Sequence, residues 1–370
     1  LVKTADDTQV WGQQYTEKMA NVAMLQQSIA HDISDELRVK LTAAQQQEMS
    51  KAPTENADAY SLYLLGRHEF DQFTPEHFIK AADYFQQAIN KDPSYAAAYG
   101  GLGEAQVMTG YSETSVREAA FAKAQAMASK ALALDNRSAE AHLTMALTDW
   151  FHWNFGAAQR GFRRALALNP NFQYAYGGYA IYLATIRRFS EAMDEARRSL
   201  ELDPLYLYGN YAVGAVYGEQ HEYDKAIAQE DKTLGIDPNY AIADGILSEC
   251  YEAEGKYDQS IDAEEKALTA DGDSKSAKEI EQVYAAQGIK GVHRWLIAED
   301  SDRAKPSYDP VTVAENYALL GDKDEAFNWL NKAFQRRDSE LIGIKSDIAW
   351  DNLRSDPRYA DLVRRIGFPQ

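Results

Sequence analysis

The tetrapeptide Asn169-Pro170-Asn171-Phe172 and its copies decide the fold of this chain. Each copy joins an acid or Asn to proline, and an aromatic residue follows two positions after the proline. The other complete copies begin at Asp92, Asp203 and Asp237, and shortened copies begin at Asp135 and Asp271. The four successive intervals from residue 135 to residue 271 are each 34 residues long. A fixed period of this length is typical of a stack of helical hairpins.

Each repeat carries two helical stretches. In the repeat after residue 170, Tyr176, Tyr179 and Leu183 lie three and four residues apart, which predicts one apolar helix face. We expect Ser190 to cap the second helix, and Pro204 follows its end because proline cannot continue a helix. Small residues recur every 34 positions where the two helices should cross, namely Ala158, Ala192, Ala226 and Ser260. Such residues allow an antiparallel pair to approach closely.

This pattern resembles the tetratricopeptide repeat (TPR). The family has a small residue at the eighth place of each unit, and the corresponding residues here are Gly66, Gly103, Ala146, Ala180, Gly214 and Ser248. It has alanine at the twentieth place, matched by Ala81, Ala124, Ala158, Ala192 and Ala226. The resemblance implies an all-α fold, a TPR α-solenoid in which antiparallel helix pairs form a right-handed superhelix. We expect about eight TPR or TPR-like hairpins across residues 57–336, with longer inter-helix loops at 73–75 and 111–116, where units gain residues.

The two ends of the chain depart from the period. Residues 337–370 predict a carboxy-terminal helical cap, since a solenoid must cover its last apolar face. Residues 1–50 predict a strand pair over Thr4–Trp11 and an amphipathic helix over Leu25–Leu41. The stretch Asp7–Tyr15 resembles the end of a TolB-like domain, which in bacteria precedes such repeats behind Ser/Thr kinase, adenylate cyclase or winged-helix activator heads. The resemblance implies that this domain is truncated here and that the chain is part of a larger bacterial protein.

The charge of the chain excludes several classes of partner. The net charge is −19, and so acidic a surface repels nucleic-acid phosphates and anionic lipid. The sequence contains no run of about 18 apolar residues, so we expect no direct membrane insertion. The acidity is concentrated between Glu219 and Asp300, where 20 acids accompany 8 bases. That stretch is either a solvated outer face or a site for a partner with basic residues.

Catalytic and metal-binding motifs are missing from the sequence. The seven His are scattered without the spacing of a zinc site, and neither a nucleophile elbow nor a phosphate-binding loop occurs. The single cysteine, Cys250, lies on an apolar helix face and is expected to be a buried, inert thiol. We therefore expect no enzymatic activity, no cofactor and no metal. One cysteine is compatible with both the cytoplasm and the periplasm, so the compartment stays open.

The concave face of the predicted solenoid is the expected binding site, because stacked hairpins present their first helices along a groove. The groove-facing positions carry aromatic, aliphatic and acidic side chains, namely Leu147, Trp150, Phe151, Tyr174, Ile181, Tyr208, Tyr211, Glu219, Glu249 and Glu252. Aromatic side chains supply large contact areas at low entropy cost, which suits the recognition of a peptide or partner protein. The alternative is that these residues only pack against neighbouring helices.

Two functions are compatible with these features. The first is a protein–protein interaction scaffold whose groove binds a partner segment that is aromatic or aliphatic at one end and basic at the other. The second is the sensory or regulatory region of a larger signalling protein, in which the groove serves the head domain or the assembly of homo-oligomers. An enzyme would need a convergent polar pocket, which the sequence does not indicate.

Overall fold

The computed structural model describes residues 2–3, 8–9, 28–29, 32–33, 54–113, 116–302 and 308–369. Near the amino terminus, β1 (Val2–Lys3) and β2 (Thr8–Gln9) form an antiparallel pair with Val2 opposite Gln9. The strand pair was expected over Thr4–Trp11, and β1 lies before that range. The rest of the predicted TolB-like segment, including most of the helix expected over Leu25–Leu41, lies outside the described residues.

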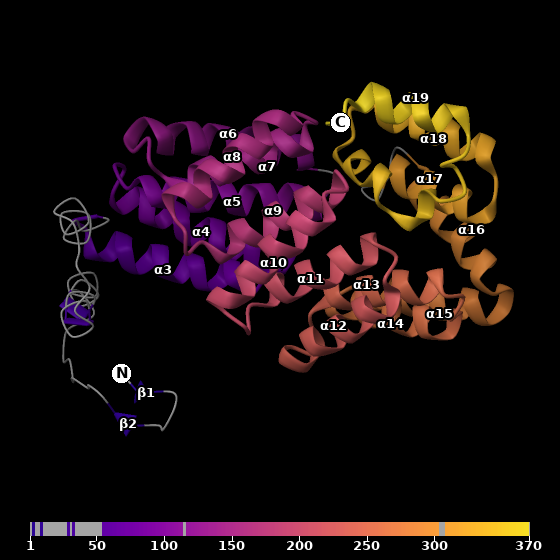
Figure 1. The fold of residues 1–370 in the computed structure, drawn as a ribbon, viewed down its shortest axis with the longest axis horizontal. Coiled ribbons are helices and arrows are strands. Elements are labelled where there is room, and N and C mark those ends of the chain that lie inside the picture. The colour runs from indigo at the N-terminus through magenta and orange to yellow at the C-terminus, as the bar shows by residue number, and fades with distance from the viewer. Residues whose placement is uncertain are drawn as a thin grey trace.

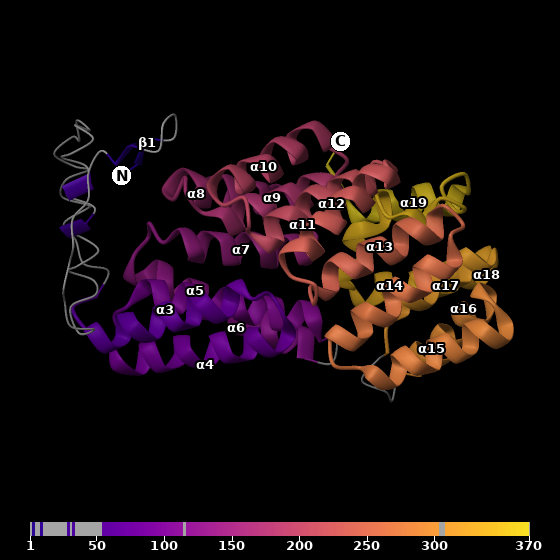
Figure 2. The same ribbon diagram turned by 90° about the horizontal axis from the view of Figure 1, so that it is seen from below.

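A continuous series of antiparallel helix pairs makes up the body of the molecule. The bounds are α3 Ala57–Asp71, α4 Pro75–Lys91, α5 Ala96–Ser112, α6 Arg117–Leu134, α7 Ala139–Phe151, α8 Phe155–Leu168, α9 Gln173–Thr185, α10 Phe189–Leu202, α11 Leu207–Glu219, α12 Tyr223–Ile236, α13 Ala241–Ala253, α14 Tyr257–Ala270, α15 Ser274–Gln287, α16 Ile289–Asp300, α17 Pro310–Leu320 and α18 Lys323–Arg336. Each odd-numbered helix packs on the next helix, and successive pairs stack on one another (Figures 1 and 2). The fold is an all-α TPR α-solenoid, as the 34-residue period predicted.

The turn between the two helices of a pair repeats in structure as well as in sequence. Trp153, Arg187, His221 and Gly255 stand 34 residues apart, and each has a left-handed backbone, with φ of 64°, 64°, 61° and 73°. This conformation costs a residue other than glycine roughly 1 kcal/mol. The first three of these turns therefore carry backbone strain that glycine would avoid.

Small residues at the eighth place make room for the helix crossing, as the period predicted. A Cβ atom added at Gly66 in α3 would lie 2.6 Å from Cε1 of Phe85 in α4. A Cβ atom at Gly101 in α5 would lie 2.7 Å from the same ring. Phe85 is fully buried, so its ring is enclosed between two glycines and has no space into which to move.

Gly66→Ala is expected to lower the free energy of unfolding by about 2 kcal/mol, because the new methyl group overpacks the Phe85 site. The matched control is Gly245→Ala in α13, where an added Cβ meets no atom within 4 Å. That change should be neutral or stabilising, since alanine favours a helix more than glycine does. Urea denaturation followed by circular dichroism compares the two variants. Equal midpoints for both would show that the Phe85 contact imposes no steric limit.

Three local predictions were wrong. The extra residues at 73–75 and around 111–116 lengthen the helices rather than the loops, because α3, α4, α5 and α6 have 15, 17, 17 and 18 residues whereas α9 and α10 have 13 and 14. The alanine-rich sequence of α6 favours its greater length, since alanine has the highest helix propensity. Ser190 does not cap α10, which begins one residue earlier at Phe189 with Arg188 as its N-cap residue. The guanidinium of Arg187 lies 5.2 Å from the centre of the Phe189 ring and covers this end of the helix.

The carboxy-terminal residues fold back instead of only covering the last repeat. After α18, the chain forms two 3-10 helices and one α-helix, namely η3 Ser339–Lys345, η4 Ile348–Trp350 and α19 Pro357–Ile366. The last of these, α19, lies on α18, where the Arg365 guanidinium is 4.0 Å from the centre of the Phe334 ring. By contrast, η3 contacts α7 and α9, so the carboxy terminus lies beside the middle of the solenoid (Figure 1). The sequence did not predict this second contact.

Candidate functional site

Arg117 anchors the carboxy-terminal segment, residues 338–351, to the solenoid. Nη1 of Arg117 lies 3.1 Å from Oδ1 of Asp338, and Nη2 contacts the Glu340 carboxylate. Nε of the same side chain donates a hydrogen bond of 3.1 Å to the Gly110 carbonyl oxygen. Arg117 is only 5% exposed, so these are buried, charge-assisted contacts, and Arg117 and Asp338 are 221 residues apart in sequence.

The inter-helix turns of three successive repeats hold the same segment. The contacts are Trp153 to Asp338, Arg187 to Lys345 and His221 to Asp351. In the first two, side-chain N–H groups donate hydrogen bonds of 3.2 and 3.1 Å to main-chain carbonyl oxygens. In the third, an imidazole nitrogen lies 3.6 Å from a carboxylate oxygen. The three side chains belong to the strained left-handed turns described above.

The residues predicted to face the groove divide into two sets. The first set is buried in the core and comprises Leu147, Trp150, Phe151, Tyr174 and Tyr208. None of these is more than 8% exposed, so their side chains pack in the core, and their role in binding stays a prediction. The second set lines two cavities and comprises Ile181, Tyr211, Glu219, Glu249 and Glu252. A role in binding stays a prediction for this second set as well.

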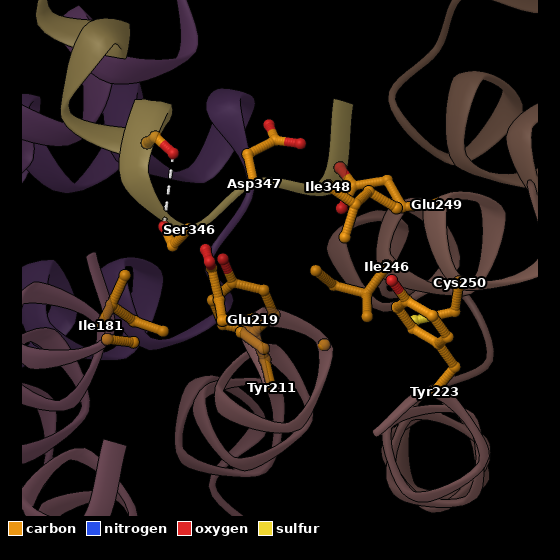
Figure 3. Close-up of a pocket in the computed structure, with 14 residues that line it drawn as sticks. Ile181, Tyr211, Glu219, Tyr223, Ile246, Glu249, Cys250, Ser346, Asp347 and Ile348 are labelled. Carbon is orange, nitrogen blue, oxygen red and sulfur yellow. Dashed lines mark hydrogen bonds between the residues drawn. The ribbon is translucent and has the colours of Figure 1, made fainter. Parts of the chain in front are cut away.

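The smaller cavity lies between the inner helices and the carboxy-terminal segment and has a volume of about 160 Å³. Its solenoid side includes Ile181 from α9 and Tyr211 and Glu219 from α11 (Figure 3). The opposite side includes Asp347 and Ile348. The contact between the segment and the groove is therefore incompletely packed, although protein interiors are normally close-packed.

The larger cavity adjoins the first and has a volume of about 580 Å³. It lies between α13, α14, α16, α17 and η4, and its acidic residues are Glu249, Glu252, Glu264, Glu315, Asp347 and Asp351. The basic side chains in its lining are Lys290, which is exposed, and His293, which is buried. The two imidazole nitrogens of His293 already have neighbours, because Nδ1 lies 2.9 Å from Oδ1 of Asn316 and Nε2 lies 3.2 Å from Oε1 of Glu252. The cavity is thus strongly acidic.

Burial and like charges make these carboxyl groups reluctant to ionise. Burial raises the pKa of Glu219 to about 8 and raises the pKa values of Glu249 and Glu315 well above the usual range. After burial, the charge of Asp347 is the largest cause of the raised pKa at both Glu249 and Glu315. Burial also raises the pKa of Asp347 itself, although its side chain accepts a hydrogen bond of 2.8 Å from the Ala349 N–H. Carboxyl groups from both sides of the contact therefore meet here.

Sequence reasoning identified Glu249 and Glu252 but missed several of their neighbours. Arg117, Glu315 and Asp347 lie outside the regular repeats that pointed to the groove. The available signal was compositional, since residues 338–347 combine three acids with three aliphatic residues in a segment that departs from the period. That composition does not reveal where the segment docks.

Other kinds of site find no support in the part of the chain that the structure describes. Within it, no group of three or more His, Cys, Asp or Glu side chains could hold a metal ion. In the same residues, no helix is long and apolar enough to cross a membrane. Cys250 is buried, as the sequence predicted, and burial raises the pKa of its thiol to about 12, which disfavours the reactive thiolate.

The chain matches two kinds of curated protein over a limited stretch. It is 28% identical over 123 residues to Transcriptional regulator HilA of Salmonella typhimurium, a stretch covering 32% of this chain and 22% of that protein. It is 23% identical over 139 residues to Putative adenylate cyclase 3 of Rhizobium meliloti, covering 37% of this chain and 24% of that protein. The chain therefore spans less than a quarter of the length of these relatives.

Solved structures of repeat proteins are also similar. Yeast Tom70 is 14% identical with a TM-score of 0.44, and the match covers 84% of this chain and 68% of that one. MamA is 26% identical with a TM-score of 0.35, and the match covers 44% of this chain and 93% of that one. A tetratricopeptide repeat protein from Parabacteroides merdae is 13% identical with a TM-score of 0.39, over 84% of this chain and 98% of that one. No family model matches the chain, and its assignment to the TPR α-solenoids rests on its own helices and period.

Proposed function

We propose that the chain is a protein-interaction scaffold whose concave face binds an extended segment of a partner protein, with a basic side chain of the partner in the larger cavity. The observation that carries this proposal is the convergence of six acidic side chains on a hollow of about 580 Å³. A Lys or Arg side chain would form charge-assisted hydrogen bonds with these carboxylates and lower their pKa values. The site would then bind without catalysing a reaction.

Selection of short random peptides against the purified chain tests this function. We expect the enriched peptides to contain Lys or Arg, and we expect Glu249→Lys to weaken their binding by at least about tenfold, because it places a positive charge in the cavity. Tyr211→Ala should weaken binding through the lost ring of the adjoining cavity. The matched control is Glu118→Lys, since the side chain of Glu118 is 80% exposed and does not line either cavity.

Two results would count against this binding function. It fails if the peptides enriched on the wild-type chain lack basic residues. It also fails if fluorescence anisotropy gives the same affinity for the wild-type chain, Glu249→Lys and Tyr211→Ala. A loss of affinity in Glu118→Lys that equals the loss in Glu249→Lys would indicate a general effect of net charge rather than a site.

A second candidate function is supported by the curated relatives. Matches to a transcriptional regulator and to a putative adenylate cyclase, at 28% and 23% identity, favour a sensory or regulatory region within a larger signalling protein. In that case the concave face serves the head domain or the assembly of copies. The gene sequence upstream of these residues tests this, because a kinase, cyclase or winged-helix domain should be encoded there together with the remainder of a TolB-like domain. An upstream sequence without such a domain would contradict it.

A further inference from the structure

The carboxy-terminal segment brings a defined chemical pattern to the concave face. The carboxylates of Asp338 and Glu340 contact Arg117. Further along the segment, the side chains of Leu341 and Ile344 are completely buried. These two aliphatic side chains belong to the same core cluster as the groove residue Trp150. With the carboxy-terminal segment docked, this part of the solenoid therefore binds two acidic residues followed by aliphatic residues.

The turns that hold the segment retain backbone strain. Trp153, Arg187 and His221 have φ of 64°, 64° and 61°, and each contacts the segment through its side chain. The equivalent turn of the next repeat has glycine, at Gly255. Strained positions that persist at a contact surface are typical of functional sites, because a side chain is needed there. These three turns therefore each place a side chain on the carboxy-terminal segment.

The segment fits the acidic end of the groove poorly. Asp347 lines both cavities, the smaller one together with Glu219 and Glu249 and the larger one together with Glu249 and Glu315, and its side chain shares a hydrogen bond with Glu315. Besides burial, the charge of Asp347 raises the pKa values of Glu219, Glu249 and Glu315, so these carboxyl groups cannot ionise freely beside it. Asp347 does have a local role, since its side chain caps η4 through the Ala349 N–H at 2.8 Å. The segment therefore matches the groove at Arg117 and conflicts with it at Asp347.

We propose that the concave face is a docking site for a partner segment that follows the pattern of residues 338–347 but has Lys or Arg at the place of Asp347, and that this chain's own segment is a displaceable, built-in competitor for that site. The partner segment would present two acids to Arg117, aliphatic side chains to the core and a cation to the acidic cavities. The inference rests on the proposed function and specifies its partner. Two features favour displacement, namely the hollow interface and the weaker hydrogen-bond geometry of 3-10 helices.

Binding of two labelled peptides to the full chain tests the proposal. One peptide has the sequence of residues 336–349, and the other is the same peptide with D347K. The receptors are the wild-type chain and the double variant Asp338→Asn/Glu340→Gln, whose own segment has lost its charges toward Arg117. We expect the double variant to bind the D347K peptide about tenfold more tightly than the unmodified peptide. We also expect it to bind both peptides more tightly than the wild-type chain, whose own segment competes.

Two outcomes would overturn the proposal. The first is equal affinity of the two peptides for the double variant, because the acidic cavities would then not recognise a basic residue at position 347. The second is equal affinity of the wild-type chain and the double variant for both peptides, because the chain's own segment would then not compete with them. If random-peptide selection enriches basic sequences while the D347K peptide has no advantage, the proposed function stands and this inference falls.

A second variant keeps the test decisive should the double variant not fold. Asp347→Asn in the full chain removes the like charge and keeps an N-cap residue for η4, because Asn caps about as well as Asp. We expect a melting temperature about 2–4 °C higher than that of the wild type and weaker binding of the D347K peptide, since the built-in segment then fits better. An unchanged or lower melting temperature would contradict the charge conflict on which the proposal depends.

Discussion

Replacing Arg117 by methionine is expected to lower the free energy of unfolding by about 3–5 kcal/mol. The substitution leaves the carboxylates of Asp338 and Glu340 without the guanidinium that they contact, and it removes the hydrogen bond to the Gly110 carbonyl. Asp338 is 7% exposed, so water cannot easily replace the lost partner. Removing one member of a buried ion pair costs more than the pair itself contributes, because the other charge stays buried. Urea denaturation followed by circular dichroism measures the loss.

Two further variants separate this effect from a general loss of charge. Arg198→Met removes an arginine from an ion pair with Glu201, but both side chains are exposed, at 46% and 64%, so a much smaller cost is expected. Arg117→Met combined with Asp338→Asn and Glu340→Gln should recover much of the loss, since no buried charge is left unpaired. If Arg117→Met costs no more than Arg198→Met, the buried anchor does not stabilise the closed arrangement.

Stability is expected to fall as the pH rises from about 6 to about 8.5. The pKa of Glu219 is raised by burial to about 8, and the pKa of Glu249 is raised well above the usual range. A carboxyl group whose pKa is higher in the folded chain binds more protons when folded, so its contribution is fully present at low pH and is lost as the pH rises through the folded pKa. We expect the melting temperature to decrease by about 5 °C or more over this interval. Differential scanning calorimetry at several pH values measures the trend.

The net charge of −19 produces a background trend of the same sign, because self-repulsion grows with pH. The double variant Glu219→Gln/Glu249→Gln separates the two contributions. It keeps most of the background charge but removes two of the groups that titrate in the smaller cavity. Its melting temperature should depend on pH less steeply than that of the wild type. If the melting temperatures of the two proteins depend on pH equally steeply, the trend is caused by overall charge and not by these two glutamates.

The repeat was predictable because it is local. The copies of the tetrapeptide end each second helix, and Tyr176, Tyr179 and Leu183 mark the face of α9, which spans Gln173–Thr185. Spacing along a helix is a property of neighbouring residues, so the sequence alone contains it. Helix boundaries were less predictable, as the start of α10 at Phe189 shows.

The site was only partly predictable because it depends on long-range closure. The period shows how one hairpin stacks on the next, but it does not show where the array meets its own carboxy-terminal segment after many repeats. Trp150 and Phe151 would face an open groove, yet in the closed fold they are 4% and 5% exposed. Glu249 and Glu252 were found from their positions on α13, whereas Asp347 comes from a segment without any period.

The measurement that tests the closed arrangement most directly is a distance distribution between spin labels on α8 and α19, obtained by pulsed electron paramagnetic resonance. Arg164 and Arg364 are exposed positions for the labels, and Cys250 is buried at 2% exposure, so it can remain. We predict one narrow distribution for the wild-type chain. Arg117→Met, or an excess of the D347K peptide, should add a population at longer distances. A distribution that is already broad in the wild type, or one that neither change alters, would contradict the account of a groove closed by its own carboxy-terminal segment.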